Sequence, residues 1–308
     1  MDETFECRNV LEKYLGNDTF VCIPKSICAI GKKAFEGNCN ITEVIIPEGV
    51  TTIEDFAFYG CENLKTVKLP NSITYIGESA FEDCWNLTCI NVPEHVKLGS
   101  SAFSHCYELA DKNGFVIVNG TLYDTTIESS TVLQIPDGVK YINDFAEFPS
   151  DIKRLIMPSS LKAIGDYVFD GRYDLETVSL PRSLYSIGEG TFMGCYSLKS
   201  INIPAICHVG DNSFDGCYSL ADSLGRIIVN GVFFESGPKS SPTLTIPEGV
   251  YRISAMADVW QEVETIILPK SLKSIGKGAF FSCDNLKSIN FPRPIEILDW
   301  NEIKICDY

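Results

Sequence analysis

The sequence predicts a β-rich solenoid (α+β, with only minor helical content) built from roughly ten stacked coils. Two observations predict it: an apolar strand ending in proline recurs at a nearly constant interval, and an aromatic residue recurs at one position of the same unit. The prolines are Pro24, Pro47, Pro70, Pro93, Pro136, Pro158, Pro181, Pro204, Pro247, Pro269 and Pro292. Successive prolines are 22 or 23 residues apart, except for two steps of 43 residues. A fixed period of about 20–50 residues is typical of solenoids and propellers, so it outweighs the two domains that 308 residues would otherwise suggest.

The repeat unit is clearest over residues 63–84, which read NLKTVKLPNSITYIGESAFEDC. The spacing of Leu64, Val67 and Leu69 predicts a short strand that points alternate side chains into a core. Pro70 has no amide hydrogen and therefore ends that strand. A second apolar segment then brings the chain back, and we expect helical or 3-10 turns at the corners of each coil.

The corner aromatic residue fills the interior of each coil, and we expect the rings to stack into a continuous ladder. These residues are Phe35, Phe58, Phe81, Phe103, Phe148, Phe169, Phe192, Phe214, Trp260 and Phe280. A cysteine three residues later recurs at Cys61, Cys84, Cys106, Cys195, Cys217 and Cys283. Coils about 4.8 Å apart bring these thiols within disulfide reach. A bridge would have to fit an evenly stacked ladder, so we expect free, buried thiols, and we assign no shared role to the other cysteines of the thirteen.

The two long steps contain hairpin signals. The segments GFVIVNGTLYD and GRIIVNGVFFE alternate apolar residues around Asn-Gly, which predicts β-hairpin inserts near 114–135 and 225–246. A degenerate copy at the start predicts an N-terminal hairpin cap over 5–23. We therefore expect residues 1–308 to form a single solenoid domain.

The open ends of a solenoid expose sheet edges and core, so both need covering. The repeat breaks after Pro292, and we expect residues 293–308 to form a C-terminal cap in which Ile295, Ile297 and Trp300 close the core. End-to-end association is the alternative use of those side chains.

The unit IPEGVTTIEDFAFYGCENLKTVKLP and the hairpin pattern V-N-G-[TV]-[LF]-[YF] resemble the BspA-like class of bacterial leucine-rich repeats over nearly the whole chain. Departures are few: Asn38 and Arg172 replace the corner cysteine, and the coils at Phe148 and Trp260 are one residue short. The resemblance implies a right-handed, curved superhelix with strands on its concave face and a role in protein or glycan recognition. Many members are surface adhesins, which implies a surface or secreted location. The start MDETFECRNVLEKY does not resemble a signal peptide and favours the cytoplasm instead.

Candidate binding residues come from the strand positions that flank the central apolar residue, because those positions face outward. They are mostly neutral, and we expect contacts with a partner at Thr66, Lys68, Asn91, Arg154, Ile156, Thr177, Ser179, Ser200 and Asn202. The concave faces of solenoids commonly bind partners in this way. A merely solvated β-face, on which threonine simply suits strands, is the other interpretation.

Other functions find little support. The formal net charge of −16 argues against nucleic acid and anionic membrane surfaces as partners, and no apolar run reaches the roughly 18 residues of a membrane span. The three histidines occupy variable repeat positions, and no zinc, phosphate-loop or calcium-loop spacing is present. We expect no catalytic residues, no cofactor and no metal, but a monomer that binds a protein or glycan. A cytosolic protein-interaction scaffold is the alternative.

Overall fold

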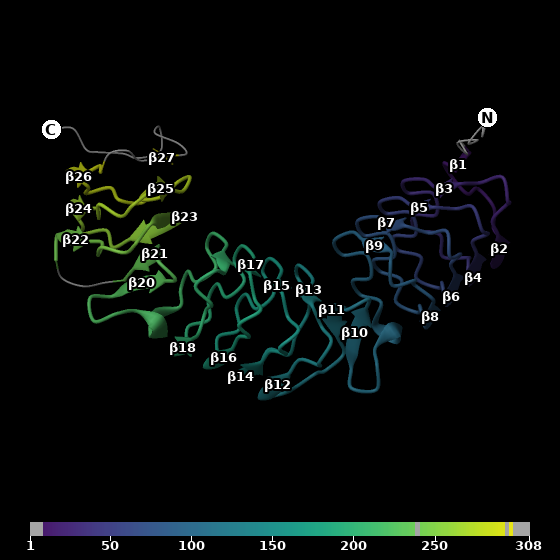
Figure 1. Ribbon diagram of the computed structural model, residues 1–308, viewed down its shortest axis with the longest axis horizontal. Helices are drawn as coiled ribbons and strands as arrows, with labels where there is room; N and C mark the ends of the chain where they lie inside the picture. Colours follow the sequence, from purple (N-terminus) through teal and green to yellow (C-terminus); the bar gives the residue numbers. More distant parts are fainter. Residues whose placement is uncertain (1–8, 238–240, 293–295, 298–308) are drawn as a thin grey trace. The chain divides into compact units, whose positions relative to one another are not determined.

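The computed structural model describes residues 9–237, 241–292 and 296–297 (Figure 1). By its internal contacts the chain separates into two compact units. Unit 1 contains residues 1–128 and 142–148, and unit 2 contains residues 129–141 and 149–308. The chain passes from one unit to the other after residues 128, 141 and 148, and the second of these points falls within strand β13 (Tyr141–Ile142). Whether the chain is one domain, as the repeat suggests, stays a prediction.

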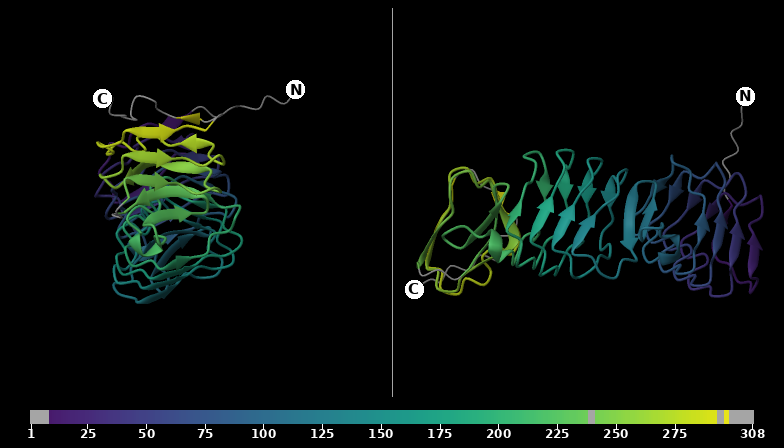
Figure 2. Two further views of the ribbon diagram at one scale, coloured as in Figure 1. Left: turned by 90° about the vertical axis from the view of Figure 1, so that its left-hand side faces the viewer. Right: turned by 90° about the horizontal axis from the view of Figure 1, so that it is seen from below.

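Unit 1 consists of coils that each contribute one strand to each of two parallel sheets. The first sheet has the order β2 (Phe20–Cys22), β4 (Glu43–Ile45), β6 (Thr66–Lys68) and β8 (Cys89–Ile90). The second has the order β1 (Val10–Leu11), β3 (Ala29–Ile30), β5 (Thr52–Ile53), β7 (Tyr75–Ile76) and β9 (Lys97–Leu98). The register follows the repeat, so that Val44 pairs with Val67 in the next coil. This regular pairing confirms the expected solenoid, and Figure 2 shows the strands side by side.

A hairpin follows the coils of unit 1. The 3-10 helix η1 (Tyr107–Leu109) leads into β10 (Phe115–Val118) and β11 (Thr121–Thr125), which pair antiparallel. Asn119 and Gly120 join them with φ of 50° and 79°. Two positive φ values are what a two-residue type I′ turn needs, which explains the Asn-Gly sequence.

Unit 2 contains the same elements. One parallel sheet has the order β12 (Val132–Gln134), β14 (Arg154–Ile156), β16 (Thr177–Ser179) and β18 (Ser200–Ile201). On the other side of these coils lie β15 (Ala163–Ile164), β17 (Ser186–Ile187) and β19 (His208–Val209).

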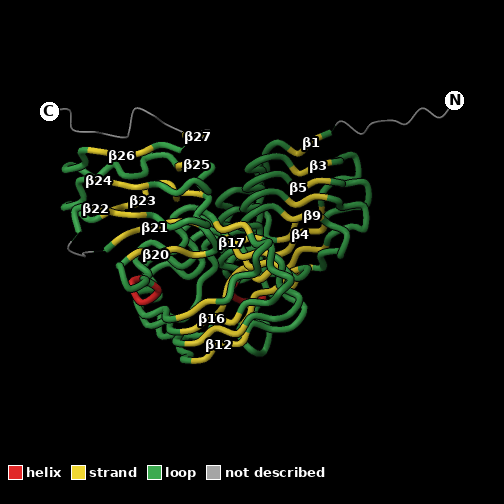
Figure 3. Tube along the Cα trace, turned by 60° about the vertical axis from the view of Figure 1, so that its left-hand side comes forward, coloured by secondary structure: helices red, strands yellow, loops and turns green. Residues whose placement is uncertain are grey.

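A second hairpin interrupts unit 2. It follows η2 (Tyr218–Leu220) and pairs β20 (Arg226–Val229) with β21 (Val232–Ser236). In the last coils β22 (Thr243–Thr245), β24 (Thr265–Ile267) and β26 (Ser288–Asn290) form a separate three-stranded sheet. On the other side β23 (Arg252–Val259), β25 (Ser274–Ile275) and β27 (Glu296–Ile297) continue the sheet of the hairpin, in the order β20–β21–β23–β25–β27. Figure 3 shows that strands and turns make up these coils, with helix only at short 3-10 segments.

The aromatic ladder is present in both units but is not continuous. In unit 1 the rings of Tyr14, Phe35, Phe58, Phe81 and Phe103 stack with centroids 4.7–5.4 Å apart. The next ring, Tyr123 of the hairpin, meets Phe103 edge-on at 78°. In unit 2 the stack of Phe169, Phe192 and Phe214 likewise ends edge-on, at 72°, against Phe234. The expectation of one unbroken ladder is therefore wrong, because each hairpin replaces a coil and turns its ring.

Trp260 is not a corner residue. Its side chain is 37% exposed, whereas the preceding Val259 is 2% exposed and fills the interior. The irregular segments FAEFPS and MADVWQ align so that Val259 corresponds to the buried Phe148, and Trp260 corresponds to Pro149. The sequence interpretation shifted this coil by one residue.

The corner cysteines are free and buried, as expected. Five of the six thiols also donate a hydrogen bond, which apolar packing alone does not explain. The Sγ of Cys61, Cys84 and Cys106 donates to the backbone carbonyl of the corner phenylalanine one coil earlier, at 3.0–3.2 Å. Cys195 and Cys217 do the same in unit 2, at 3.3 and 3.1 Å. Cysteine therefore fits this corner because it is small, apolar and a weak donor. Cys28, by contrast, is disulfide-bonded.

The expected caps lie partly outside the described residues. At the N-terminal end, β1 pairs with β3 in parallel and Tyr14 stacks on Phe35, so the described part of 5–23 extends the coil stack and contains no antiparallel hairpin. At the other end, β27 pairs with β25. Ile295 and Trp300 of the expected C-terminal cap lie outside the described residues, as does most of 293–308. Within the part of the chain that is described, no helix is long and apolar enough to cross a bilayer.

Candidate functional site

The outward face of the β12–β14–β16–β18 sheet contains most of the residues expected to contact a partner. Arg154, Thr177 and Ser200 are register neighbours on adjacent strands, and Ile156 pairs with Ser179. In β14 and β16 the central residue is buried while the flanking residues are exposed or half-buried. The alternation confirms that these positions face outward. We call this row of outward side chains in unit 2 the strand face.

The remaining expected residues, Thr66, Lys68 and Asn91, belong to unit 1. Thr66 and Lys68 flank the buried Val67 on β6. The Nζ of Lys68 lies 3.0 Å from Oε1 of Glu43 on the neighbouring β4, and the Lys68 side chain is 60% and the Glu43 side chain 35% exposed. Such an exposed ion pair contributes little to stability. The expected residues thus divide between the sheets of two units.

The side chains of Asn91 and Asn202 form hydrogen bonds to the backbone, a structural role that the sequence analysis did not predict. The Asn91 side chain accepts the Leu69 N–H at 3.0 Å and donates to the Leu69 carbonyl at 3.0 Å. Asn202 makes the same pair of bonds to Leu180, and Asn290 makes it to Leu268. In the other coils the backbone of the next strand supplies this N–H partner, as where Ile46 donates to the Lys68 carbonyl.

These asparagines are the last of their coil runs, directly before a hairpin or the end of the repeat. Their side-chain oxygens take the place of the backbone carbonyl that accepts this N–H in the regular coils, so the last coil of each run stays bonded to the coil before it. The signal was available in the sequence, since only these final coils have Asn at the position two residues before proline.

Arg154 differs from its neighbours. It is exposed on β14, and among the described residues none makes an ion pair or hydrogen bond with its guanidinium. Val132 and Thr177 flank it in register on either side. The guanidinium of Arg154 is planar and its N–H donors are surrounded by neutral side chains, so it is suited to bidentate binding of a carboxylate.

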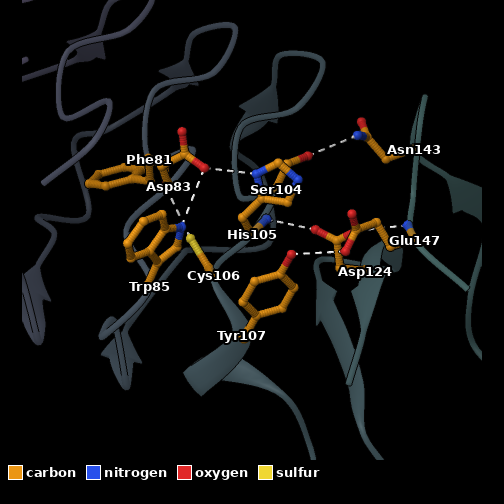
Figure 4. Close-up of polar contacts among 10 residues, drawn as sticks. All are labelled: Phe81, Asp83, Trp85, Ser104, His105, Cys106, Tyr107, Asp124, Asn143 and Glu147. Atoms are coloured by element: carbon orange, nitrogen blue, oxygen red, sulfur yellow. Dashed lines mark hydrogen bonds and ion pairs between the residues drawn. The ribbon is translucent and has the colours of Figure 1, made fainter. Parts of the chain in front are cut away.

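A second polar group lies in unit 1 where the coils meet the first hairpin (Figure 4). Asp124, on β11, is 1% exposed and accepts the backbone N–H of His105 at 2.6 Å and of Glu147 at 2.8 Å. In a regular coil the N–H at the position of His105 donates to the next coil, as Gly60 does to the Glu82 carbonyl. The hairpin removes that carbonyl, and the Asp124 carboxylate takes its place.

The charges in this group are unusual. Burial raises the pKa of Asp124 to about 6, although its two backbone donors and His105 lower it. His105 Nδ1 lies 2.8 Å from Asp83 Oδ1. Burial alone would lower the pKa of His105, but the hydrogen bond to Asp83 and the charges of Asp124 and Glu147 together raise it. The surrounding acids therefore favour the charged form of the imidazole against the effect of burial.

The adjacent Cys106 is not arranged as a nucleophile. It is fully buried, its thiol donates to the Phe81 carbonyl, and burial raises its pKa well above the ordinary value. A reactive cysteine needs the opposite shift. Nothing in this group points to catalysis.

Glu82, Asp83 and His105 offer donor atoms within 4.8 Å of one another, which is the spacing a metal ion would require. The contact between His105 and Asp83 is that of a hydrogen-bonded ion pair, so the two side chains already satisfy each other.

The chain resembles known bacterial proteins. The family model described as the BspA type leucine-rich repeat region matches residues 17–113, 116–222 and 226–307 in six copies. A leucine-rich repeat protein of T. pallidum is 26% identical, with 61% of this chain and 82% of that chain covered and a TM-score of 0.39. One from Bacteroides ovatus is 22% identical over 94% and 85% of the chains, with a TM-score of 0.41. The pneumococcal vaccine antigen PcpA is 21% identical over 83% and 74%, with a TM-score of 0.45.

No curated protein matches the sequence significantly. The family model nevertheless covers most of the chain, and it does so with the coil units and hairpins described above. The chain belongs to the family of BspA-type leucine-rich repeat proteins.

Proposed function

We propose that this protein is a non-enzymatic binding module that recognises a protein or glycan through the strand face. The observation that carries the proposal is Arg154, an exposed cation without a partner among the described residues, in a row of neutral side chains. The chain has a net charge of −16, so its overall charge attracts basic surfaces. A single exposed arginine instead favours one local acidic group on the partner, which makes Arg154 a selective feature.

The occupant that fits is a carboxylate on the partner, either an aspartate or glutamate side chain or an acidic sugar. Arg154 supplies the charged donors, Thr177 supplies a hydroxyl beside it and Ser200 one on the next strand, and Ile156 supplies apolar contact area. We no longer expect Asn202 to contact the partner, because its side-chain amide is hydrogen-bonded to the backbone of Leu180.

The test is a binding screen against immobilised extracellular-matrix proteins and an array of neutral and acidic glycans. The wild type is compared with the double variant Arg154→Glu, Thr177→Glu. Lys162→Glu is the matched control, because Lys162 is an exposed cation of unit 2 beside β15, away from β14 and β16. The proposal predicts that the double variant loses the ligands that the wild type and Lys162→Glu both retain. Equal binding by all three proteins would refute it.

A further inference from the structure

Strand β8 is the last strand of its sheet in unit 1 (Figure 1). It pairs with β6, and no other described strand pairs with its far edge. In the regular coils that edge bonds to the next coil, as where the Lys65 carbonyl accepts the N–H groups of Thr88 and Cys89. Ile46 likewise donates its N–H to the Lys68 carbonyl of the next coil.

At the end of the run the same repeat positions lack these partners. Thr88 corresponds to Lys65, and Val92 corresponds to Ile46 two coils earlier. Among the described residues, no backbone N–H bonds to the Thr88 carbonyl, and no acceptor bonds to the Val92 N–H.

The backbone groups of Ile90 belong to the same open edge. Ile90 lies two residues from both Thr88 and Val92, and residues two apart in a strand direct their backbone groups to the same side. The Asn91 side chain does not close this edge, because it bonds to Leu69 in the preceding coil. Three alternate residues therefore present the donors and acceptors that a further parallel strand would use.

A groove of about 360 Å³ lies along this edge. Ile90 and Val92 line one side of it, and Leu109 of η1 with Ile117 and Val118 of the first hairpin line the other. All of these except Ile117 are partly buried apolar residues packed against the core of unit 1. The groove is thus an extension of the core beside an unpaired strand, and we call it the edge groove.

We propose that the edge groove binds an extended segment of a partner protein, which adds to the sheet as a strand parallel to β8. An unpaired strand edge is a template for another extended chain, because only such a chain offers N–H and C=O groups at the matching spacing. The apolar lining selects an apolar side chain at the central position of the segment. In the regular strands this position is filled by residues such as Val44 and Val67, which are buried.

The site lies in unit 1 and uses no residue of the strand face. It therefore does not depend on the function proposed for Arg154.

The chain itself supplies a probe and a reporter for this proposal. The probe is a synthetic peptide with the sequence of residues 64–70, LKTVKLP, that carries the substitution Thr66→Cys. Thr66 pairs with Cys89 in register, so a peptide that continues the repeat beyond β8 places its cysteine beside Cys89. Strands about 4.8 Å apart bring two such residues within disulfide reach, and Cys89 is free and exposed.

The measurement is disulfide trapping on the full chain. The peptide is added as its mixed disulfide with 2-mercaptoethanol, and attack by the Cys89 thiolate releases 2-mercaptoethanol. Peptide mass spectrometry then maps the adducts. We expect at least about tenfold more adduct at Cys89 than at Cys39, which is also free and exposed but lies outside the strands. A peptide with Val67→Cys in place of Thr66→Cys should lose this preference, since that position points inward.

Backbone methylation distinguishes strand addition from simple apolar contact. Lys68 faces the preceding coil, as its bond to Ile46 shows, whereas Val67 faces the following coil. N-methylation of the peptide at Lys68 removes an N–H that would bond to β8, and should lower the adduct at Cys89 to the level at Cys39. N-methylation at Val67 is the matched control and should leave the adduct unchanged.

A variant of the protein tests the groove itself. Val118→Trp should fill the groove and lower the adduct at Cys89 at least about tenfold. Val229→Trp is the matched control, because Val229 has the corresponding position in the second hairpin. The methylated peptides need no altered protein, so they decide the question even if Val118→Trp fails to fold.

Four results would each overturn the proposal. These are equal adducts at Cys89 and Cys39, equal trapping by the two methylated peptides, undiminished trapping by a folded Val118→Trp, and trapping that increases on dilution of the protein. The last result would mean that a second copy of this chain, and not a partner protein, occupies the edge groove.

Discussion

At the scale of single residues, this protein uses side chains to complete backbone hydrogen bonding at the ends of its coil runs. The Asn91 amide takes the place of a backbone carbonyl towards the preceding coil, and Asp124 replaces a carbonyl that the hairpin removes. A buried N–H without a partner costs roughly 1–3 kcal/mol, which accounts for charged and amide side chains at these edges. The sequence did not reveal Asp124, because a lone acid in a hairpin resembles any solvated acid until the neighbouring coil is known.

Asp215 is expected to make stability fall as pH rises. Burial raises its pKa to about 7 in the folded protein against an ordinary value of 3.8, so between about pH 4 and 7 the folded state holds a proton that the unfolded chain has released. The stabilisation is fully present below about pH 4 and is lost as pH rises to about 7. Asp215→Asn removes this dependence, so we expect it to be more stable than the wild type at pH 8, by on the order of 2–4 kcal/mol.

Urea unfolding of the wild type and of Asp215→Asn at pH 4.5 and pH 8 measures the difference in their free energies of unfolding. The stability gain of Asp215→Asn should be larger at pH 8. An equal gain at both pH values, or none, would show that Asp215 is not the group that titrates.

At the scale of elements, the proline period, the alternating strand pattern and the Asn-Gly dipeptides were sufficient to predict the coils and both hairpins. These features are local, so a single sequence displays them. The misplacement of Trp260 had a different cause: an aromatic residue fitted the spacing, but the coil has an irregular length. Only the packing shows that Val259 fills the core.

The buried ladder is expected to be far more sensitive to truncation than the side chain of Trp260. Phe192 is fully buried between Phe169 and Phe214, so Phe192→Ala leaves a cavity and should destabilise unit 2 by about 3–5 kcal/mol. Trp260 is 37% exposed, and Trp260→Ala should cost much less. Chemical denaturation followed by circular dichroism compares the two. A larger loss from Trp260→Ala would mean that the coil follows the original repeat spacing.

At the scale of the whole molecule, the repeat distributes thirteen cysteines into chemically different classes. The corner thiols are buried, and burial raises the pKa of Cys61 and Cys195 to about 12. Cys22, Cys39 and Cys89 are free and exposed. Reactivity should therefore follow repeat position and not the number of cysteines.

Alkylation of the native protein followed by peptide mass spectrometry tests this distribution. Cys22, Cys39 and Cys89 should be modified within minutes, because their thiols are accessible. Corner cysteines such as Cys61 and Cys195 should react at least about a hundredfold more slowly and become equivalent to the others in denaturant. Rapid modification of Cys61 in the native protein would contradict the packing of its coil.

We propose that the strand face around Arg154 is the docking surface of this protein. The most direct measurement is hydroxyl-radical footprinting with and without the ligand that the binding screen identifies. Val132 is 54% exposed and is register partner of Arg154, while Ile206 is 78% exposed and lies off the strand face. We expect the ligand to protect Val132 and Ile156 from oxidation and to leave Ile206 unchanged. Protection of Ile206 with none at Val132 and Ile156 would contradict it.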